Sequence, residues 1–187
     1  MNGNSRRRHK VKGFKGKNGI LLDIGCGETW RPGYVRLDKD SRVKPDILHD
    51  LEVFPYPLKD EVCLSIVACH IVEHIKPWLM IDFMNELWRV SKFDCQFAIK
   101  VPYGVNSSFI QDPTHCNPCN ETTWQYFDPR YKTVYDKYKP KPWKIEFASY
   151  QANGNMEVLL RKIHPETTSE VLKKVESESS SVSRRQV

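Results

Sequence analysis

The chain has 187 residues, of which 40% are hydrophobic and 28% are charged. This size and balance predict one soluble domain with a hydrophobic core of its own. They exclude a membrane protein, because no apolar run approaches the roughly 20 residues that a membrane span needs. The basic start lacks the apolar segment of a signal peptide, and most of the six cysteines fall in apolar runs. We therefore expect a cytoplasmic protein with free thiols.

The net charge of +6 arises in the first residues of the chain. Residues 1–17 contain seven Lys or Arg and no acid, which leaves 22 basic and 23 acidic residues, a net charge of −1, for the rest. Residues 1–18 are predicted to be a disordered basic arm. Such an arm either contacts nucleic acid, by releasing counterions from phosphates, or is simply a solvated tail.

A short apolar run at residues 20–24 leads directly into Gly25, Cys26 and Gly27. This pattern predicts a buried strand of a parallel sheet, followed by a tight turn where the backbone can approach a ligand. Trp30 stands where a dinucleotide-binding fingerprint would place its third glycine. That departure counts against a nicotinamide cofactor.

A second strand is predicted for residues 34–38, and it ends in Asp38. A carboxylate at this position can accept hydrogen bonds from both ribose hydroxyls of a nucleoside. Only ten residues separate Gly27 from Asp38, and they include a Pro-Gly turn. Because a crossover between parallel strands needs a dozen or more residues, we expect the first helix to be reduced to a turn or absent.

Residues 46–50 predict a short third strand with Asp50 at its carboxyl end. Ligands of open α/β sheets bind at this end of the strands, so Asp50 is a candidate ligand contact. The alternative is that Asp50 caps a helix or turn.

A fourth apolar strand is predicted at residues 63–70, and His70, Glu73 and His74 lie where it passes into a loop. The two histidines would share one face of a helical turn. Together with the acid they could bind a metal ion, but we favour a site without metal.

The next segments alternate between helical and extended patterns. An amphipathic helix is predicted over 77–91, and it would pack against the sheet through Trp78, Ile81, Met84, Leu87 and Trp88. A fifth strand is predicted at residues 95–102, and a hairpin at 144–150 and 155–163 is joined by an Asn-Gly turn. Between residues 124 and 144 aromatic rings alternate with Lys and Arg. They form either a stacking surface for a base or sugar phosphate, or a loop whose rings cover the sheet.

A polar loop at residues 106–120 contains Asp112 and His115. His115 could act as a general base with Asp112 orienting it, or Asp112 could form an Asp-Pro turn beside a structural histidine. Cys116 and Cys119 suggest zinc, but no second Cys/His pair lies nearby. Free thiols are therefore favoured over a zinc site.

The order and spacing of these motifs resemble the class I S-adenosylmethionine-dependent methyltransferases. The resemblance is to the compact branch with Gly-Cys-Gly, Pro-Gly-Tyr, His-Asp-Leu, Glu-His-Ile and Asp-Pro-Thr-His motifs. It covers about residues 19–163 and implies one three-layer, Rossmann-like α/β domain. Its sheet would have seven mostly parallel strands in the order 3-2-1-4-5-7-6, closed by the antiparallel hairpin. Residues 164–187 are rich in Ser, Glu and Lys and are predicted to be a largely disordered tail.

The resemblance also implies S-adenosylmethionine as cofactor and methyl transfer by in-line displacement as the activity. The residues on the cofactor side would be Asp23, Gly25, Cys26, Gly27, Asp38, Asp50, Leu51 and His70. Asp38 would hold the ribose and Asp50 the adenine amino group, while main-chain amides of residues 25–28 would face the charged end of the cofactor. His115 and Asp112 would form the catalytic pair on the acceptor side, and no metal would be required.

The methyl acceptor is left open between nucleic acid, a sugar or nucleotide, and another small molecule. We expect a monomer or weak dimer that does not associate with membranes. One rival function is a non-catalytic nucleotide- or nucleic-acid-binding module with the same fold. The other is an NAD-dependent oxidoreductase, which Trp30 and the reduced first helix disfavour.

Overall fold

A computed structural model describes residues 19–164 and residue 167. The seven strands are β1 (Ile20–Ile24), β2 (Tyr34–Asp38), β3 (Ile47–Leu48), β4 (Cys63–Cys69), β5 (Ser91–Pro102), β6 (Trp143–Tyr150) and β7 (Asn155–Lys162). The α-helices are α1 (Met80–Val90), α2 (Ser107–Ile110), α3 (Glu121–Gln125) and α4 (Lys132–Tyr135). Short 3-10 turns are η1 (Ser41–Val43), η2 (Val72–His74) and η3 (Pro77–Leu79). The predicted basic arm and almost all of the predicted tail lie outside the described residues.

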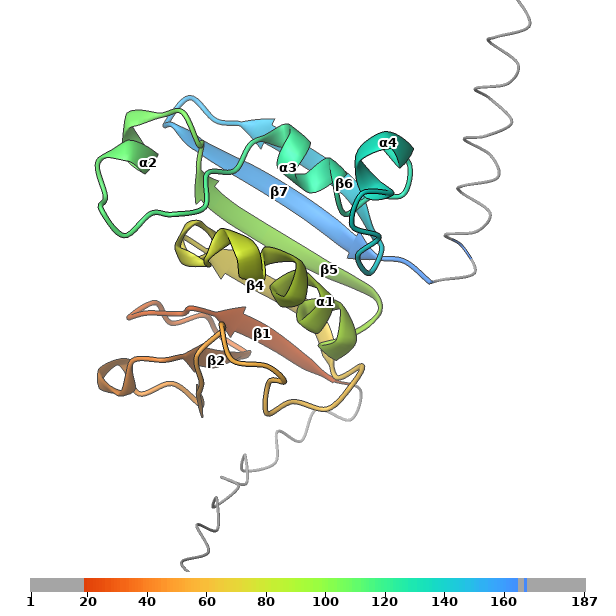
Figure 1. The fold of residues 1–187 in the computed structure, drawn as a ribbon. Coiled ribbons are helices and arrows are strands. Elements are labelled where there is room, and N and C mark those ends of the chain that lie inside the picture. The colour runs from red at the N-terminus through yellow and green to blue at the C-terminus, as the bar shows by residue number, and fades with distance from the viewer. Residues whose placement is uncertain (1–18, 165–166, 168–187) are drawn as a thin grey trace, which may run out of the picture.

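The strands form one sheet in the order β3-β2-β1-β4-β5-β7-β6 (Figure 1). The pairs among β1 to β5 are parallel, and β7 runs antiparallel between β5 and β6. This topology confirms the predicted Rossmann-like sheet and its closing hairpin. Because parallel strands end at the same edge, the loops after β1, β2, β3, β4 and β5 lie together.

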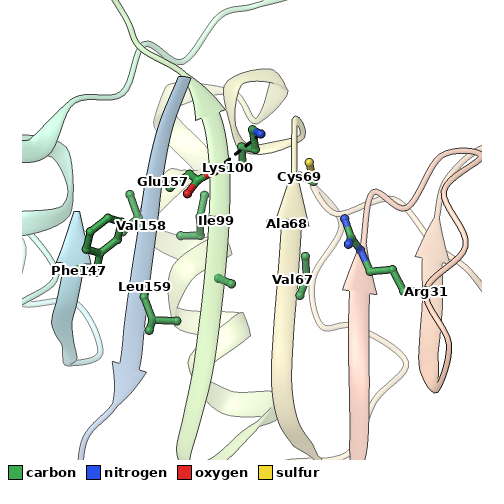
Figure 2. Close-up of a pocket in the computed structure, with 11 residues that line it drawn as sticks. Arg31, Val67, Ala68, Cys69, Ile99, Lys100, Phe147, Glu157, Val158 and Leu159 are labelled. Carbon is green, nitrogen blue, oxygen red and sulfur yellow. Dashed lines mark ion pairs between the residues drawn. The ribbon is translucent and has the colours of Figure 1, made fainter. Parts of the chain in front are cut away.

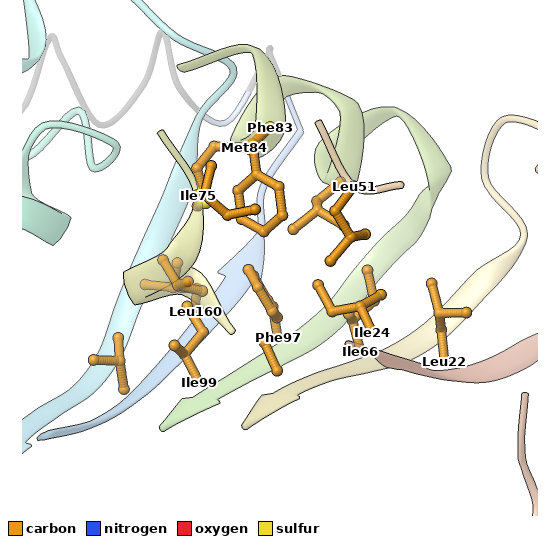
Figure 3. Packing of buried hydrophobic residues seen from close by; sticks show 14 of the residues in the cluster. Leu22, Ile24, Leu51, Ile66, Ile75, Phe83, Met84, Phe97, Ile99 and Leu160 are labelled. Carbon is orange, nitrogen blue, oxygen red and sulfur yellow. The ribbon is translucent and has the colours of Figure 1, made fainter. Parts of the chain in front are cut away.

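The hydrophobic core lies on one face of this sheet, beneath α1 (Figure 3). Alternate residues of the central strands point into it, as in β7, where every second side chain is buried. Phe83, Met84 and Leu87 of α1 are fully buried against Ile66 and Phe97 of the sheet. At about 25 cal/mol per Å² of apolar surface, burying one such side chain contributes roughly 1.5–3 kcal/mol.

The predicted apolar stripe of this helix is only partly correct. Met84 and Leu87 are buried, Ile81 and Trp88 are half-buried, and Trp78 is 75% exposed. Trp78 lies in η3, ahead of α1, where the 3-10 geometry rotates side chains away from the α-helical stripe.

Among residues 19–164, α1, α3 and α4 lie over the same face of the sheet (Figure 1), and Figure 2 shows the opposite face. Arg31 of the β1–β2 loop extends over this face, and it lines a hollow of about 300 Å³ together with Val67, Cys69, Lys100 and Phe147. Residues 25–33 contain no helix, as their short length predicted, so the connection between β1 and β2 adds no helix to this face.

None of the helices in the part of the chain that the structure describes has the length and apolar character needed to cross a membrane.

Candidate functional site

A small cavity of about 60 Å³ lies at the carboxyl ends of β1, β2 and β3. Its lining comes from the loops that follow these strands and β4: Gly25, Asp38, Lys39, His49, Asp50, Leu51, Glu52, Ile71, His74 and Ile75. Four predicted cofactor residues are thus brought together here, namely Gly25, Asp38, Asp50 and Leu51. The four others, Asp23, Cys26, Gly27 and His70, do not line the cavity.

The glycine turn is shaped around Ile71. Gly25 has φ +59°, and a Cβ atom placed on it would lie 2.4 Å from Cγ1 of Ile71. Gly27 has φ +50°, but a Cβ there would face open space. Gly25 therefore makes room for the Ile71 side chain in this structure, whereas Gly27 is required only for its backbone conformation.

Asp38 organises the turn through two backbone amides. Its Oδ2 accepts from the Gly27 amide at 2.8 Å, and its Oδ1 accepts from the Asp40 amide at 2.9 Å. The Cys26 amide donates to the Leu37 carbonyl at 3.2 Å. Two of the amides expected to face a cofactor are therefore satisfied within the protein. A carboxylate has about four acceptor positions, so Asp38 can still accept from a ligand hydroxyl.

Asp50 and Leu51 follow β3 at the far side of the cavity. Asp50 Oδ1 accepts from the Glu52 amide at 3.0 Å, which is the capping role left open from the sequence. Leu51 is 5% exposed and belongs to the core, and its carbonyl accepts from the Tyr56 hydroxyl at 3.0 Å. Asp50 is therefore held in place by its turn, with acceptor capacity remaining toward the cavity.

Asp23 lies apart from this cavity, on the face of the sheet that Arg31 covers. It is 2% exposed and accepts from Nε of Arg31 at 3.0 Å. Burial raises the pKa of the Asp23 carboxyl above its ordinary value, although Arg31 acts in the opposite direction. Asp23 thus has a partner within the protein, and the structure does not place it beside the other predicted cofactor residues.

A second group of polar side chains lies next to the cavity. Glu73 and His74 of η2 meet His115 of the loop between α2 and α3, and one ligand atom from each lies within 4.8 Å of the others. His70 Nδ1 is 3.2 Å from Glu73 Oε1. His74 lines the cavity as well, so it connects the two sites.

Two backbone links fix this group. The amides of Cys116 and Asn117 both donate to the Glu73 carbonyl, at 2.9 and 3.0 Å, and Asn117 Nδ2 donates to the Val72 carbonyl. Because Asn117 is 7% exposed, these hydrogen bonds are shielded from water. They hold the His115 loop against η2.

Glu73 is buried, and only one of its two carboxylate oxygens has a hydrogen-bond partner. Its side chain is 1% exposed, and its Oε2 atom has no hydrogen-bond partner. Burial raises the pKa of Glu73 to about 7. Burial also lowers the pKa of His70 and of His74.

The structure brings His115 and Asp112 together, but not as the predicted base and its orienter. His115 Nδ1 is 2.9 Å from the Phe109 carbonyl, while Nε2 is 3.7 Å from Asp112 Oδ2, beyond hydrogen-bond distance. Asp112 instead accepts from the amide and hydroxyl of Thr114, and these bonds lower the pKa of Asp112. Phe109 is therefore the residue that orients the imidazole.

The two loop cysteines do not converge on His115. Cys119 is 1% exposed, and its thiol donates to the Asn117 carbonyl; burial raises the pKa of this thiol to about 12. The Cys116 thiol faces the carbonyls of His74 and Ile75. All six cysteines are free thiols.

In the aromatic and basic segment between α3 and β6, some rings cover the sheet and others are exposed where a ligand could stack. Trp124, Phe127 and Trp143 are buried in the core and cover the sheet. Tyr126 and Tyr138 line a hollow of about 500 Å³ beside α1. The exposed rings of this segment are thus those at the hollow and Tyr131, which is 41% exposed outside it.

Sequence reasoning missed Ile71 and Lys39 as lining residues. Ile71 is an ordinary apolar residue in sequence, and its role depends on a contact with Gly25 that only the folded chain creates. Lys39 directly follows Asp38, so its position at the strand end was an available signal. Glu73 and His74 were recognised as a motif, but their contact with the His115 loop was not.

Comparison with solved structures identifies similar folds at low sequence identity. A SAM-dependent methyltransferase from Archaeoglobus fulgidus has a TM-score of 0.56 and 16% identity, covering 77% of this chain and 86% of that one. An S-adenosylmethionine-dependent methyltransferase from Mesorhizobium loti has a TM-score of 0.53 and 10% identity, covering 78% and 92%. A mutant 16S rRNA (adenine(1408)-N(1))-methyltransferase from Catenulisporales acidiphilia, with the cosubstrate SAM, has a TM-score of 0.52 and 11% identity, covering 80% and 88%.

No protein-family model and no curated protein matches the sequence. The similarity is therefore one of fold, that of the class I S-adenosylmethionine-dependent methyltransferases.

Proposed function

We propose that the chain is an S-adenosylmethionine-dependent methyltransferase whose cofactor binds at the carboxyl ends of β1, β2 and β3. One observation carries the proposal: Gly25, Asp38 and Asp50, from three different loops, line one cavity on a sheet of order 3-2-1-4-5-7-6. A glycine turn with two carboxylates at this edge suits a nucleoside.

The chemistry of the lining fits the cofactor. Asp38 would accept from the ribose hydroxyls and Asp50 from the adenine amino group, since both carboxylates keep acceptor positions beyond their backbone contacts. Leu51 and Ile71 would pack against the base. When bound, S-adenosylmethionine supplies an electrophilic methyl group to the acceptor.

The cavity must widen to admit a molecule of that size. Its volume of about 60 Å³ is well below the roughly 300–1,000 Å³ of ligand pockets. Ile71 fills the space above Gly25, so a shift of Ile71 is the simplest opening motion. Methyl transfer then depends chiefly on holding the acceptor in line with the methyl group. If the acceptor must lose a proton, His115 Nε2 is the candidate base.

Ligand-dependent melting separates this proposal from its rivals. S-adenosylhomocysteine should raise the melting temperature of the full chain, because a ligand that binds only the folded state stabilises it. A rise with NAD instead would identify an oxidoreductase, and a rise with neither would favour a non-catalytic module. Transfer of labelled methyl groups to RNA, sugar-nucleotide and protein pools would then identify the acceptor.

A further inference from the structure

The group formed by Glu73, His74 and His115 has no role in binding the cofactor as proposed above. Its ligand atoms come from two loops and lie within 4.8 Å of one another. The backbone bonds from Cys116 and Asn117 to the Glu73 carbonyl hold the two loops in register. The group is therefore assembled by the fold and not by chance contact of mobile side chains.

Both imidazole rings are oriented with Nε2 available. His115 Nδ1 is 2.9 Å from the Phe109 carbonyl. His74 Nδ1 is 3.3 Å from the Thr114 carbonyl and 3.1 Å from the Thr114 hydroxyl, which itself donates to Asp112 Oδ1. A carbonyl oxygen can only accept, so each Nδ1 carries the hydrogen and each Nε2 carries a lone pair. A backbone carbonyl on Nδ1 is the arrangement that orients histidines which bind metal ions.

Glu73 supplies the negative charge. Its side chain is 1% exposed; Oε1 lies 3.2 Å from His70 Nδ1 and 4.0 Å from His115 Nε2, while Oε2 has no hydrogen-bond partner. A buried carboxylate is unfavourable unless it is fully paired or binds a metal ion. A cation bound among the three ligand atoms, which lie within 4.8 Å of one another, would neutralise it.

We propose that Glu73, His74 and His115 bind a divalent transition-metal ion, with Zn²⁺ as the best match. Two imidazoles and one carboxylate form a donor set that Zn²⁺ prefers, and a fourth position would stay open. Tetrahedral ligands at about 2.0–2.2 Å from zinc lie about 3.3–3.6 Å apart, so the three atoms must draw in from their present separation.

At this position the ion would activate the methyl acceptor, a role that rests on the proposed methyltransferase function. His74 lines the cofactor cavity, so the open coordination position would lie where an acceptor must approach. An oxygen or nitrogen of the acceptor would bind there with a lowered pKa, and its proton would pass to bulk water. While the ion is bound, the His115 lone pair is occupied, so His115 cannot also be the general base.

Metal titration of the full chain, first stripped with a chelator, tests the proposal. We expect one Zn²⁺ to bind per chain in calorimetry. His74→Ala and His115→Ala should each weaken binding by at least about tenfold. His49→Ala, at a histidine of the same cavity outside the group, and Cys116→Ser, at the nearby exposed thiol, should leave the affinity unchanged.

Glu73→Gln keeps the test decisive even if the histidine variants fold poorly. It removes the buried charge, so the metal-free variant should melt at or above the temperature of the parent chain, yet lose the Zn²⁺-induced rise. Zinc binding that survives His74→Ala and His115→Ala, or that disappears in Cys116→Ser, would overturn the site. S-adenosylhomocysteine binding, measured on the same samples, shows separately whether the methyltransferase proposal holds.

Discussion

Gly25 and Gly27 turn the chain after β1 with the same left-handed backbone, but only Gly25 has a neighbour above it. Gly25→Ala should lower the free energy of unfolding by about 1–2 kcal/mol, because alanine is strained in this backbone conformation, and by about 1–3 kcal/mol more because its Cβ overpacks against Ile71. Gly27→Ala should lower it only by the roughly 1–2 kcal/mol of backbone strain. Urea unfolding of both variants measures the difference, and equal losses would show that Ile71 is not packed on Gly25.

Arg31 compensates the buried carboxylate of Asp23. Arg31→Ala should lower the unfolding free energy by about 1–3 kcal/mol at pH 7, because it leaves that carboxylate without its cation. An acid whose pKa folding raises binds more protons in the folded state, so stability falls as pH rises from its ordinary value of 3.8. The loss should therefore shrink as the pH falls toward 4.

A double variant provides the control for this pair. Asp23→Asn removes the charge, and in its background Arg31→Ala should lose much less stability. A full loss in that background would mean that Arg31 acts by covering the sheet and not by pairing with Asp23.

The sequence allowed the roles of some of these residues to be predicted, but not those of others. Asp38 and Asp50 could be predicted as site residues because each ends an apolar run, and parallel strands bring their carboxyl ends to one edge. Asp23 also lies in such a run, but its side chain points to the face where Arg31 meets it. Pairing with a loop residue depends on loop geometry, which the apolar pattern does not encode.

Glu86 of α1 connects this helix by a hydrogen bond to the loop before β4. Glu86 accepts from the Tyr56 amide at 2.6 Å and from Arg89 Nε at 2.8 Å. Burial raises the pKa of Glu86, but these bonds outweigh it and leave the pKa below its ordinary 4.5. Glu86→Gln should therefore lose about 1–3 kcal/mol at pH 7.

Because folding lowers the pKa of Glu86, the stability that Glu86 contributes should decrease in acid. A depressed acid pKa contributes stability that is present above the ordinary pKa and is lost as the pH falls through the folded value. The gap between Glu86→Gln and the parent chain should close in acid denaturation profiles. Asp82→Asn, at an exposed acid of the same helix, is the matched control. A gap that persists throughout the acid denaturation profile would assign the effect to packing.

At the level of elements, the apolar runs predicted where the strands lie, although β5 begins at Ser91, four residues ahead of the predicted start at residue 95. The absence of a helix between β1 and β2 was predictable from the small number of residues that connect these strands. The exposure of Trp78 was not, since a 3-10 turn and an α-helical turn share the same sequence signals over three residues. Likewise β3 is only Ile47–Leu48, shorter than the apolar pattern suggested.

Across the whole molecule, α1, α3 and α4 lie over one face of the sheet, and Arg31 of the β1–β2 loop extends over the other face beside a hollow lined mainly by strand residues. The strand order followed from the resemblance, and it is confirmed. The contact of Glu73 and His74 with His115 could not be foreseen, because it joins loops after two different strands. Only the packing of those loops shows that the three residues form one group.

The basic arm lies outside the described residues. Every described residue that lines the cavity lies between positions 25 and 75, so deleting residues 1–17 should leave the affinity for S-adenosylhomocysteine unchanged. If the acceptor is a nucleic acid, the deletion should weaken its binding and flatten the salt dependence, because seven cations are removed. Loss of cofactor affinity on deletion would instead assign the arm to the cofactor site.

Calorimetric titration with S-adenosylhomocysteine tests the central claim most directly, when the parent chain is compared with Asp38→Asn and Asp40→Asn. Asp38→Asn removes the charged acceptor at the cavity, while Asp40→Asn changes a neighbouring acid that pairs with Arg42 outside it. We predict binding by the parent chain and by Asp40→Asn, and a loss of about 1–3 kcal/mol, roughly 5- to 150-fold in affinity, for Asp38→Asn. Equal affinity for Asp38→Asn, or no binding by the parent chain, would contradict a cofactor site at the ends of β1, β2 and β3.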